Sequence, residues 1–350
     1  MALKDKKICV GTGLVALDAV VNGDPKNPSK LFAGGSCGNV LAILAYLGWN
    51  TFPVSRLAKN KASVHLVKDL GAFGVNTTHL SCDREGSTPI IIQRLLKTKT
   101  GGYKHKFEFR DPFTGKRLPK YKPVSEEIAR ELEEKLPVPT VFYFDRVNTG
   151  AVALAKYFFK NNKTLIFFEP SSMKRTRLFQ EAAAHSHVIK FSDERLPDYA
   201  RLFRSQLAPL EIETLGKEGI KYRFSHSKRS VKWISVPGYL IEKPVDTVGA
   251  GDWCSAGIIA SLFPKGVESL KTLTLDSLAK AFAYGQALGA LNCLFMGARG
   301  LMYHLAPKAA NTLANSLIKG KDNSIAPLKP LPARHKNEEI KYTDITLLYS

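Results

Sequence analysis

The chain has 350 residues, 44% hydrophobic and 23% charged, which excludes a mainly disordered or fibrous protein and allows a large buried core. Its 51 lysines and arginines outnumber 31 aspartates and glutamates, for a formal net charge of +20. That charge attracts nucleic acid, phosphorylated ligands or anionic membranes without selecting among them. Because the positive residues are dispersed, we interpret them mainly as a solubilising surface.

Five cysteines, at positions 9, 37, 82, 254 and 293, are widely separated and form no CxxC pair. They predict neither a disulfide framework nor a zinc site. The first residues lack the apolar core of a secretory signal, and no apolar run reaches the roughly 18 residues that span a bilayer. We therefore expect a cytoplasmic protein with no membrane partner.

The chain opens with KKICVGTG, a β-branched apolar run that predicts a strand broken at Gly11 and Gly13. The next segment, GGSCGNVLAILAYLGW, passes from a glycine cluster to apolar residues at helical spacing. It ends at Gly48, as helices often do. These elements predict a strand, a loop and a helix in that order.

From Thr88 to Tyr121 the sequence alternates and is rich in β-formers, which predicts a hairpin around a Gly-Gly turn. Its segment Lys97–Arg110 mixes lysines with aromatics and is the best nucleic-acid candidate, although we favour a solvated hairpin. After a helix predicted from Ser125, the apolar runs TVFYFDRV, KTLIFFEP and HSHVIKFS alternate with helix-compatible stretches. This alternation predicts a parallel sheet with helices on both faces.

The last third repeats the scheme, with strand-like PLEIETLGKEG, further strands around Lys232–Val236 and a helical LAKAFAYGQALGALNCLF. Beyond about Lys319 the chain turns polar and proline-bearing, which is typical of a linker before one short strand. We therefore expect one domain over residues 1–319 and an extension over 320–350 that either docks or stays free.

The stretch VDTVGAGDWCSAGIIA joins an apolar run, expected to be a strand ending at Val245, to a helix expected to start near Asp252. Gly249, Ala250 and Gly251 would then form the turn. Small residues let a ligand approach the backbone, and the free N–H groups of a first helical turn attract an anion such as phosphate. A carboxylate there suits a base that takes a proton from an alcohol, so these residues predict phosphoryl transfer to a hydroxyl.

The segment DTVGAGDWCSAG closely resembles the C-terminal signature of the PfkB/ribokinase family of sugar and nucleoside kinases, and GGSCGN resembles its N-terminal glycine motif. The resemblance covers roughly residues 6–315. It implies a doubly wound, mostly parallel sheet with helices on both faces and a small β lid, from about 19–33 and 88–121. It also implies an ATP- and Mg²⁺-dependent carbohydrate kinase.

The same resemblance assigns roles to individual residues. The catalytic base corresponds to Asp252, and the anion hole corresponds to Gly249, Ala250 and Gly251. Substrate hydroxyls are expected at Asp18, Gly34, Gly35 and Asn39, and the nucleotide at Thr214, Gly216, Lys217, Gly219 and Gln286. Asp246 would order the turn, with a monovalent cation such as K⁺ in some members.

Each of these residues also has a structural alternative. Asp18 could cap a turn, Asn39 could be the N-cap of a helix, Thr214 could end a strand and Lys217 could be an exposed turn lysine. Trp253, beside the expected base, suits either an unusual pocket or packing under the sheet.

Parts of the family pattern are altered. The Asn-x-x-Glu element that organises magnesium and phosphates reads KFSDERL, which puts Ser192 and Arg195 in those places. Either Glu194 joins the magnesium network or Arg195 meets a phosphate as a fixed charge. The usual DPN reads EPSS at Glu169–Ser172, and the proline of the glycine motif is Ser36. These changes predict an acceptor other than a plain hexose or ribose.

Three functions remain open. The first is an ATP-dependent kinase for a sugar or sugar-like alcohol, and the nearest alternative is a nucleoside kinase. A kinase-like nucleic-acid-binding or scaffold protein would suit the charge of +20 and the altered magnesium element, but Asp252 argues against it. Pairing of lid edges between subunits would make a homodimer.

Overall fold

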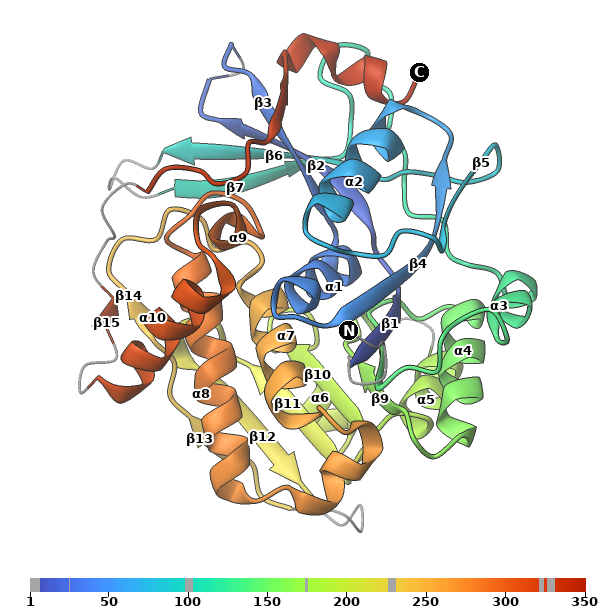
Figure 1. The fold of residues 1–350 in the computed structure, drawn as a ribbon, viewed down its shortest axis with the longest axis vertical. Coiled ribbons are helices and arrows are strands. Elements are labelled where there is room, and N and C mark those ends of the chain that lie inside the picture. Colours follow the sequence, from blue (N-terminus) through green and yellow to red (C-terminus); the bar gives the residue numbers. More distant parts are fainter. Residues whose placement is uncertain are drawn as a thin grey trace, which may run out of the picture.

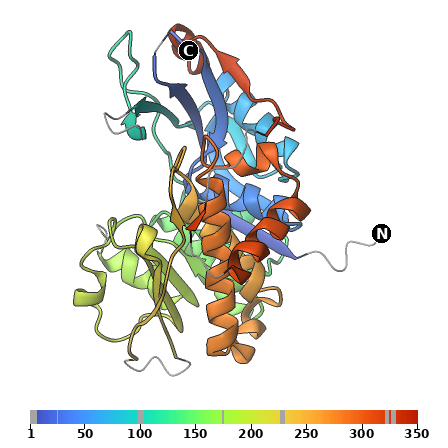
Figure 2. The same cartoon turned by 90° about the vertical axis from the view of Figure 1, so that its left-hand side faces the viewer.

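The computed structural model describes residues 7–24, 26–97, 103–173, 176–225, 231–320, 324–325 and 331–350. A large sheet with helices on both faces forms the body, and a smaller sheet stands at one end of it (Figures 1 and 2). Among the described helices, none combines the length and apolarity that a membrane crossing requires.

The large sheet has nine strands in the order β13-β12-β11-β10-β9-β8-β1-β4-β5. In this spatial order, the strands β11, β10, β9, β8, β1, β4 and β5 pair in parallel, whereas β12 and β13 are antiparallel to their neighbours. In chain order the strands are β1 (Ile8–Thr12), β4 (Asn50–Ala58), β5 (Leu80–Asp83), β8 (Val141–Phe144), β9 (Leu165–Phe168), β10 (Val188–Ser192), β11 (Leu210–Thr214), β12 (Ile220–Phe224) and β13 (Ile234–Val236).

Both faces of the large sheet are buried, because successive side chains of a strand point to opposite faces. In β8, Val141 and Tyr143 pack in a core with α1, α7 and α8, whereas Phe142 and Phe144 pack in a second core with α3 to α6. The helices are α1 (Ser36–Tyr46), α2 (Lys61–Ala72), α3 (Glu126–Leu132), α4 (Thr149–Lys160), α5 (Thr176–Ala184), α6 (Tyr199–Leu202), α7 (Ala250–Leu262), α8 (Leu275–Asn292), α9 (Gly300–His304) and α10 (Pro307–Lys319), with 3₁₀ turns at Gly216–Glu218, Gly266–Thr272 and Tyr342–Leu348.

The smaller sheet has the order β16-β3-β2-β6-β7, and we call it the lid sheet. Only the β2 and β6 pair is parallel in it. Its strands are β2 (Ala16–Asn22), β3 (Ser29–Gly34), β6 (Ile90–Lys97), β7 (Tyr103–Glu108) and β16 (Glu338–Ile340), while β14 (Leu240–Ile241) and β15 (Ser324–Ile325) form a separate pair. The Gly-Gly turn of the predicted hairpin lies outside the described residues.

The C-terminal segment docks on the lid sheet rather than staying free. Strand β16 pairs antiparallel with β3, and the segment lies beside the lid in Figure 2. Glu338 forms an ion pair with Lys68 and a hydrogen bond with His65, both of α2. Ile345 and Leu348 are buried in the core that contains α1 and α7. The segment therefore ties the lid sheet to the body through both charge and apolar packing.

The predicted α/β architecture is confirmed, with two local differences. The run before residue 245 was expected to be a strand, but β14 stops at Ile241 and Val245 lies in a loop, where its N–H donates to the carbonyl oxygen of Cys293 (2.8 Å). Pro244 has no N–H for a sheet ladder, which explains the stop. Strand β1 also continues through Gly11, and only Gly13, with φ of 150°, ends it.

Candidate active site

Helix α7 begins at Ala250, after a turn that only glycine can make. Its N-cap, Gly249, has a left-handed backbone with φ of 81°. A Cβ atom on Gly249 would lie 2.2 Å from the carbonyl oxygen of Ala298. Positive φ and this close approach both exclude a side chain. The helix therefore starts earlier than the expected Asp252, because Gly249 makes the left-handed turn.

The loop before α7 is fastened to the loop that follows α8. The carboxylate oxygens of Asp246 accept hydrogen bonds from the N–H groups of Val248 and Gly297, each at 2.8 Å. The side-chain amide of Asn292 donates to the carbonyl oxygens of the same two residues, each at 3.3 Å. Both clasping side chains are buried, so the position of the helix N-terminus is rigidly defined.

Trp253 also serves this packing. Its side chain is fully buried, its indole N–H donates to the carbonyl oxygen of Ala298 at 3.2 Å, and its ring meets Tyr46 edge to face. Of the two alternatives for Trp253, packing in the core is the correct one.

The first turn of α7 presents backbone N–H groups to open space. The N–H of Trp253 makes the first i to i−4 bond, to Gly249, so the N–H groups of Gly251 and Asp252 precede the helical ladder. Gly251 is exposed, and no atom lies within 4 Å of the place where its Cβ would be. Protein packing therefore does not require glycine at position 251, and the open space leaves the backbone accessible to a ligand.

Asp252 is held by a residue from the other sequence motif. The amide Nδ2 of Asn39 donates to Oδ2 of Asp252 at 2.7 Å. Asn39 lies inside α1, whose N-cap is Gly35, so the N-cap alternative for Asn39 is wrong. Its buried Oδ1 has no hydrogen-bond partner. The fold thus brings together the glycine motif GGSCGN, which contains Asn39, and the segment DTVGAGDWCSAG, which contains Asp252.

The residues expected to bind substrate include a second carboxylate, Asp18, with Gly34 beside it. Asp18 lies buried in β2, not in a turn, and its Oδ1 has no hydrogen-bond partner. Gly34, the last residue of β3, lies against Asp18, and a Cβ atom on Gly34 would lie 2.1 Å from Asp18 Oδ2. A Cβ on Gly35, where φ is 79°, would lie 2.4 Å from the carbonyl oxygen of Leu14. Both glycines therefore allow a backbone approach that a side chain would block.

Further polar atoms near Asp18 are unpaired. Gln93 of β6 lies close enough to Asp18 to lower the pKa of that carboxyl, and its buried Oε1 has no partner. Arg299 is fully buried and donates to the carbonyl oxygen of Ala33, while its Nη1 has no partner. Buried polar groups normally find partners, so a cluster of unpaired ones needs a ligand or water to complete it.

The two carboxylates have strongly altered acidity. Burial raises the pKa of Asp252 to about 7, with Glu169 adding to the rise and the Asn39 hydrogen bond opposing it. Burial likewise raises the pKa of Asp18 to about 7, with Arg299 opposing and Asp252 adding. The positive charge of Arg195 lowers the pKa of Asp252, which places that exposed side chain within electrostatic reach of it. A pKa near 7 suits a group that accepts a proton at neutral pH.

A buried ion pair lies beneath the first turn of α7. Lys190 of β10 donates to Glu169 Oε1 at 2.7 Å and to the carbonyl oxygen of Gly251 at 3.3 Å. The hydroxyls of Ser255 and Tyr143 donate to Glu169 Oε2 at 2.6 and 3.0 Å. The Lys190 ammonium thus polarises the peptide whose N–H belongs to Asp252, which strengthens that N–H as a donor to an anion.

The expected nucleotide residues gather at one end of the large sheet. Thr214 is the last residue of β11, so its strand-end alternative is also correct, and its hydroxyl donates to Phe191. A Cβ on Gly219, where φ is 107°, would lie 2.2 Å from the carbonyl oxygen of Val236. Gly216 has φ of 56° and nothing within 4 Å of its Cβ position, so that side of the loop is open.

Gln286 of α8 reaches the same region. Its Nε2 donates to the carbonyl oxygen of Pro237 at 3.2 Å, in the loop that packs against Gly219. Lys217 is exposed in the 3₁₀ turn, as its alternative supposed, and makes no ion pair with a described carboxylate.

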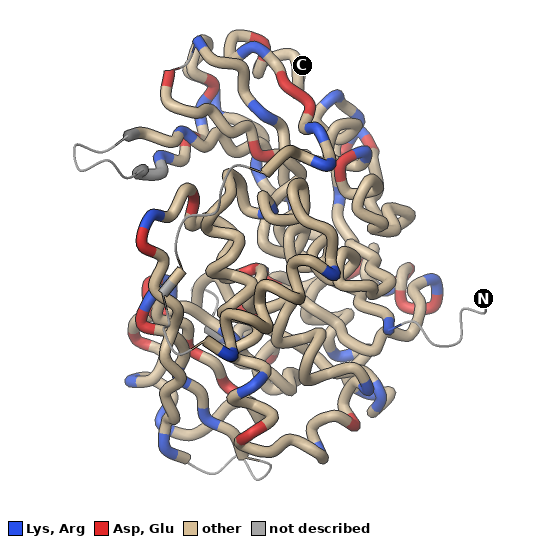
Figure 3. Tube along the Cα trace, turned by 60° about the vertical axis from the view of Figure 1, so that its left-hand side comes forward, with Lys and Arg blue, Asp and Glu red and all other residues tan. Residues whose placement is uncertain are grey.

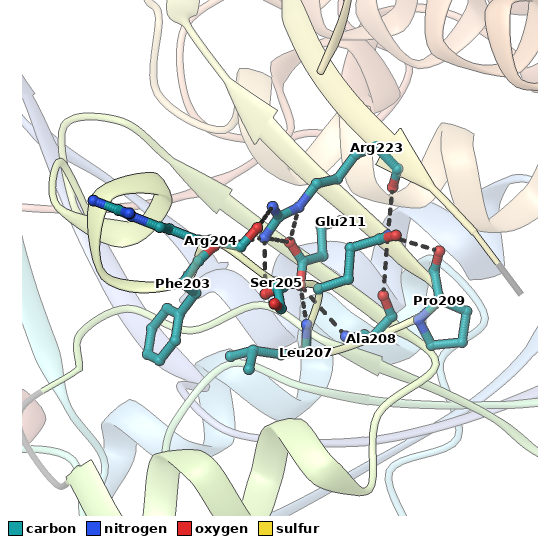
Figure 4. Close-up of polar contacts among 9 residues, drawn as sticks. Phe203, Arg204, Ser205, Leu207, Ala208, Pro209, Glu211 and Arg223 are labelled. Carbon is teal, nitrogen blue, oxygen red and sulfur yellow. Dashed lines mark hydrogen bonds and ion pairs between the residues drawn. The ribbon is translucent and has the colours of Figure 1, made fainter. Parts of the chain in front are cut away.

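The segment that leads into β11 is fixed by a buried ion pair between Glu211 and Arg223 (Figure 4). Arg223 Nε donates to Glu211 Oε2 at 2.7 Å, and its Nη atoms donate to carbonyl oxygens of residues 203–205. Glu211 Oε1 accepts from the N–H of Leu207 at 2.6 Å. Every charge has partners, so this pair anchors β11 and β12 around the Thr214 turn.

The expected metal residues do not form a cluster. Among the described residues, no group of three His, Cys, Asp or Glu side chains could hold a metal ion. Glu194 is exposed, and its N–H donates to Asp193 Oδ1. Asp246 directs both oxygens to backbone N–H groups, as described above. The five cysteines are free.

Glu169, Lys190, Gln93 and Arg299 were not among the expected site residues. A signal existed for Lys190, because a lysine inside the apolar run HVIKFS must be buried with a partner. Glu169, directly after the apolar run LIFF, is the matching carboxylate. No comparable signal marks Gln93 or Arg299, which the fold brings to Asp18 from distant parts of the chain.

Comparisons with known proteins are consistent with this geometry. The sequence profile described as pfkB family carbohydrate kinase matches residues 6–303. No curated protein matches significantly. Similar solved structures include a nucleoside kinase of Methanocaldococcus jannaschii (15% identity, 89% of this chain and 99% of that chain, TM-score 0.62) and an Arabidopsis thaliana ribokinase complexed with ribose and ATP (15%, 88% and 99%, 0.61). Another is an aminoimidazole riboside kinase of Salmonella enterica (19%, 88% and 100%, 0.61). At these identities the structures show a shared fold.

Two glycine substitutions in the same turn should have opposite effects on stability. Gly249→Ala should lower the free energy of unfolding by more than about 1 kcal/mol, because of its positive φ and the contact with Ala298. Gly251→Ala should leave it unchanged or raise it by up to about 1 kcal/mol, because alanine favours the helix and the space is open. Denaturant unfolding measures both. Equal destabilisation would show that protein atoms fill the space beside Gly251.

The buried ion pair predicts strong coupling. Lys190→Met should cost about 3–5 kcal/mol, because it leaves the Glu169 carboxylate buried without its cation. Adding Glu169→Gln should recover part of that loss. Denaturant unfolding of the wild type, both single variants and the double variant gives the coupling energy. Additivity within about 0.5 kcal/mol would contradict the pairing.

Proposed function

Because the chain belongs to the pfkB family of carbohydrate kinases, we propose that it transfers the γ-phosphoryl group of ATP to a hydroxyl of a sugar or sugar-like alcohol. The observation that carries the proposal is the first turn of α7, which presents free N–H groups to open space beside a carboxylate of raised pKa. An anion site and a proton acceptor at one place are the two parts that phosphoryl transfer to an alcohol requires.

Asp252 is assigned as the base. Its Oδ2 accepts the Asn39 hydrogen bond, and its Oδ1 accepts none from the described residues, so Oδ1 is available to the acceptor hydroxyl. As the acceptor oxygen forms its bond to phosphorus and the bond to the departing ADP breaks, the hydroxyl proton passes to Asp252. Asn39 keeps the carboxylate oriented, which is a positioning role.

The anion hole is assigned to the turn of Gly249, Ala250 and Gly251 and to the first N–H groups of α7. These donors are fixed by the clasp of Asp246, so they need no reorganisation when charge develops on the transferred group. Arg195 supplies a positive charge within electrostatic reach of Asp252, which supports direct contact with a phosphate.

Magnesium is the cofactor that ATP-dependent transfer implies, and it neutralises charge on the phosphates. The described residues offer no all-protein cage, which fits an ion that keeps waters and uses one or two carboxylates plus substrate phosphates. We assign the carboxylate of Glu194 to this role. For K⁺, the Asp246 carboxylate is already used by N–H groups, so carbonyl oxygens of the clasped loops would have to hold the ion.

The unpaired oxygens of Asp18, Asn39 and Gln93 and the free Nη1 of Arg299 favour an acceptor with several hydroxyls. A nucleoside kinase would need an aromatic surface for the base, and Phe109 of the lid lines a cavity against the C-terminal segment instead. A sugar-like acceptor is the proposal, with a nucleoside as the alternative.

The nucleic-acid alternative receives no added support. In Figure 3, lysines and arginines lie at many separate places along the described part of the chain, as expected of a basic surface. A homodimer through lid edges stays a proposal, and β16 already covers the β3 edge, which leaves the β7 edge for a second copy.

Asp252→Asn should lower the rate constant of phosphoryl transfer by about 10²–10⁴-fold, because the amide cannot accept the proton. Binding of ATP should stay nearly unchanged. A screen of ADP release over sugars, sugar phosphates and nucleosides identifies the acceptor, with this variant as the blank. The exposed Asp276→Asn is the matched control and should keep full activity. Equal turnover of wild type and Asp252→Asn would remove the proposed base.

The pKa of Asp252 sets the pH dependence. A base works only when deprotonated, so kcat/KM should rise with pH through about 7. Asn39→Ala removes a hydrogen bond that lowers this pKa, so the rise should move to higher pH. Steady-state kinetics across neutral pH measures both profiles. A flat profile, or a shift of the variant to lower pH, would contradict the assignment.

A further inference from the structure

A cavity of about 970 Å³ lies between the lid sheet and the C-terminal segment, and Asp252 is not among its lining residues. It is lined by β6, β7, the turn at 109–115 and the start of the final 3₁₀ turn. Its volume falls in the range that small-molecule sites occupy, roughly 300–1,000 Å³. None of the expected site residues lines it.

The cavity carries more positive than negative charge. Its cations are Lys26, Arg94, Lys106, Arg110 and Lys341, against the carboxylates of Glu108 and Asp111. Lys26, Arg110 and Lys341 form no ion pair with any described carboxylate, and Arg94 has a buried Nε with no hydrogen-bond partner. Lys26 and Lys341 are therefore free to meet an anion, while Arg110 donates through Nη1 to the carbonyl oxygen of Gly115 at 2.9 Å and its other guanidinium N–H groups have no partner among the described residues.

Both carboxylates are already committed to the protein. Glu108 accepts from Lys106 (2.8 Å), Arg94 (3.4 Å) and the hydroxyl of Tyr342 (3.3 Å). Asp111 Oδ1 accepts from the N–H groups of residues 113 and 114, and Oδ2 accepts from the hydroxyls of residues 346 and 349. The Asp111 hydrogen bonds also fix the C-terminal segment, so the cavity depends on the docked segment.

Aromatic rings form the other part of the wall. Phe109 is 59% exposed and Phe113 is 55% exposed. The ring of Phe113 meets Tyr342 edge to face at 5.7 Å between centroids. Large exposed aromatic side chains beside cations offer a stacking surface next to phosphate-binding groups.

We propose that this cavity binds a nucleoside phosphate, with its phosphates against Arg110, Lys26 and Lys341 and its base against Phe109 and Phe113. Charge-assisted hydrogen bonds to phosphate supply the affinity, and the rings supply selection for a base over a bare anion. Arg94 lines this cavity, and its neighbour on β6, Gln93, lies near Asp18 of the proposed acceptor site. Strand β6 therefore connects the two sites. The proposal does not depend on the kinase assignment.

The test uses the full chain with 8-azido-ADP as the probe and peptide mapping of the photolabel. Label should appear on peptides from 106–117 or 331–350, separately from any label near Thr214 and Gln286. Arg110→Glu, and separately Lys341→Glu, should weaken labelling of these peptides about tenfold or more, because each reverses a phosphate contact. Lys308→Glu, an exposed lysine of α10 that does not line the cavity, is the matched control and should label as wild type.

Several outcomes would overturn the proposal. Label confined to the peptides near Thr214 and Gln286 would remove the second site. Equal loss of cavity labelling in Lys308→Glu and Arg110→Glu would show general charge attraction instead. Displacement of the label by inorganic pyrophosphate as effectively as by ADP would reduce the site to a phosphate site without base recognition. Thermal unfolding of each variant confirms that the fold is retained.

Discussion

The whole site depends on the clasp between the loop before α7 and the loop after α8. Asp246 and Asn292 tie the two loops together, and Gly249 turns the chain where Ala298 leaves no room for a side chain. This contact sets the direction of α7, so its first N–H groups face open space beside Gly251. A helix N-terminus fixed in that way is a preorganised anion site, since its dipoles need not move when charge develops.

Burial then gives the site its acid and base character. Asp18 is buried and Asp252 is partly buried, and desolvation is the main cause of their raised pKa values. Glu169 contributes to that rise while Lys190 keeps Glu169 itself compensated. Glu169, beneath helix α7, thus raises the pKa of Asp252 without contacting the reacting atoms. The net charge of +20 acts differently, as a long-range attraction for polyanionic ligands.

The sequence predicts what local patterns determine. Short apolar runs bounded by polar residues identified β8, β9 and β10, and the glycine spacing identified the turn before Asp252. Contacts between distant segments could not be predicted from local sequence patterns. Examples are the pairing of β16 with β3 and the approach of Gln93 and Arg299 to Asp18. Val245 was misassigned because an apolar run was interpreted as a strand, whereas the residue lies half-buried in a loop.

A crystal structure of the chain with ADP, Mg²⁺ and aluminium fluoride would test the central claim most directly, because the fluoride complex mimics the phosphoryl group in flight. The account predicts fluoride atoms about 2.7–3.1 Å from the backbone nitrogens of Gly251 and Asp252, with the Asp252 carboxylate on the side away from ADP. A fluoride complex bound elsewhere, or one separated from these N–H groups by protein atoms, would contradict it.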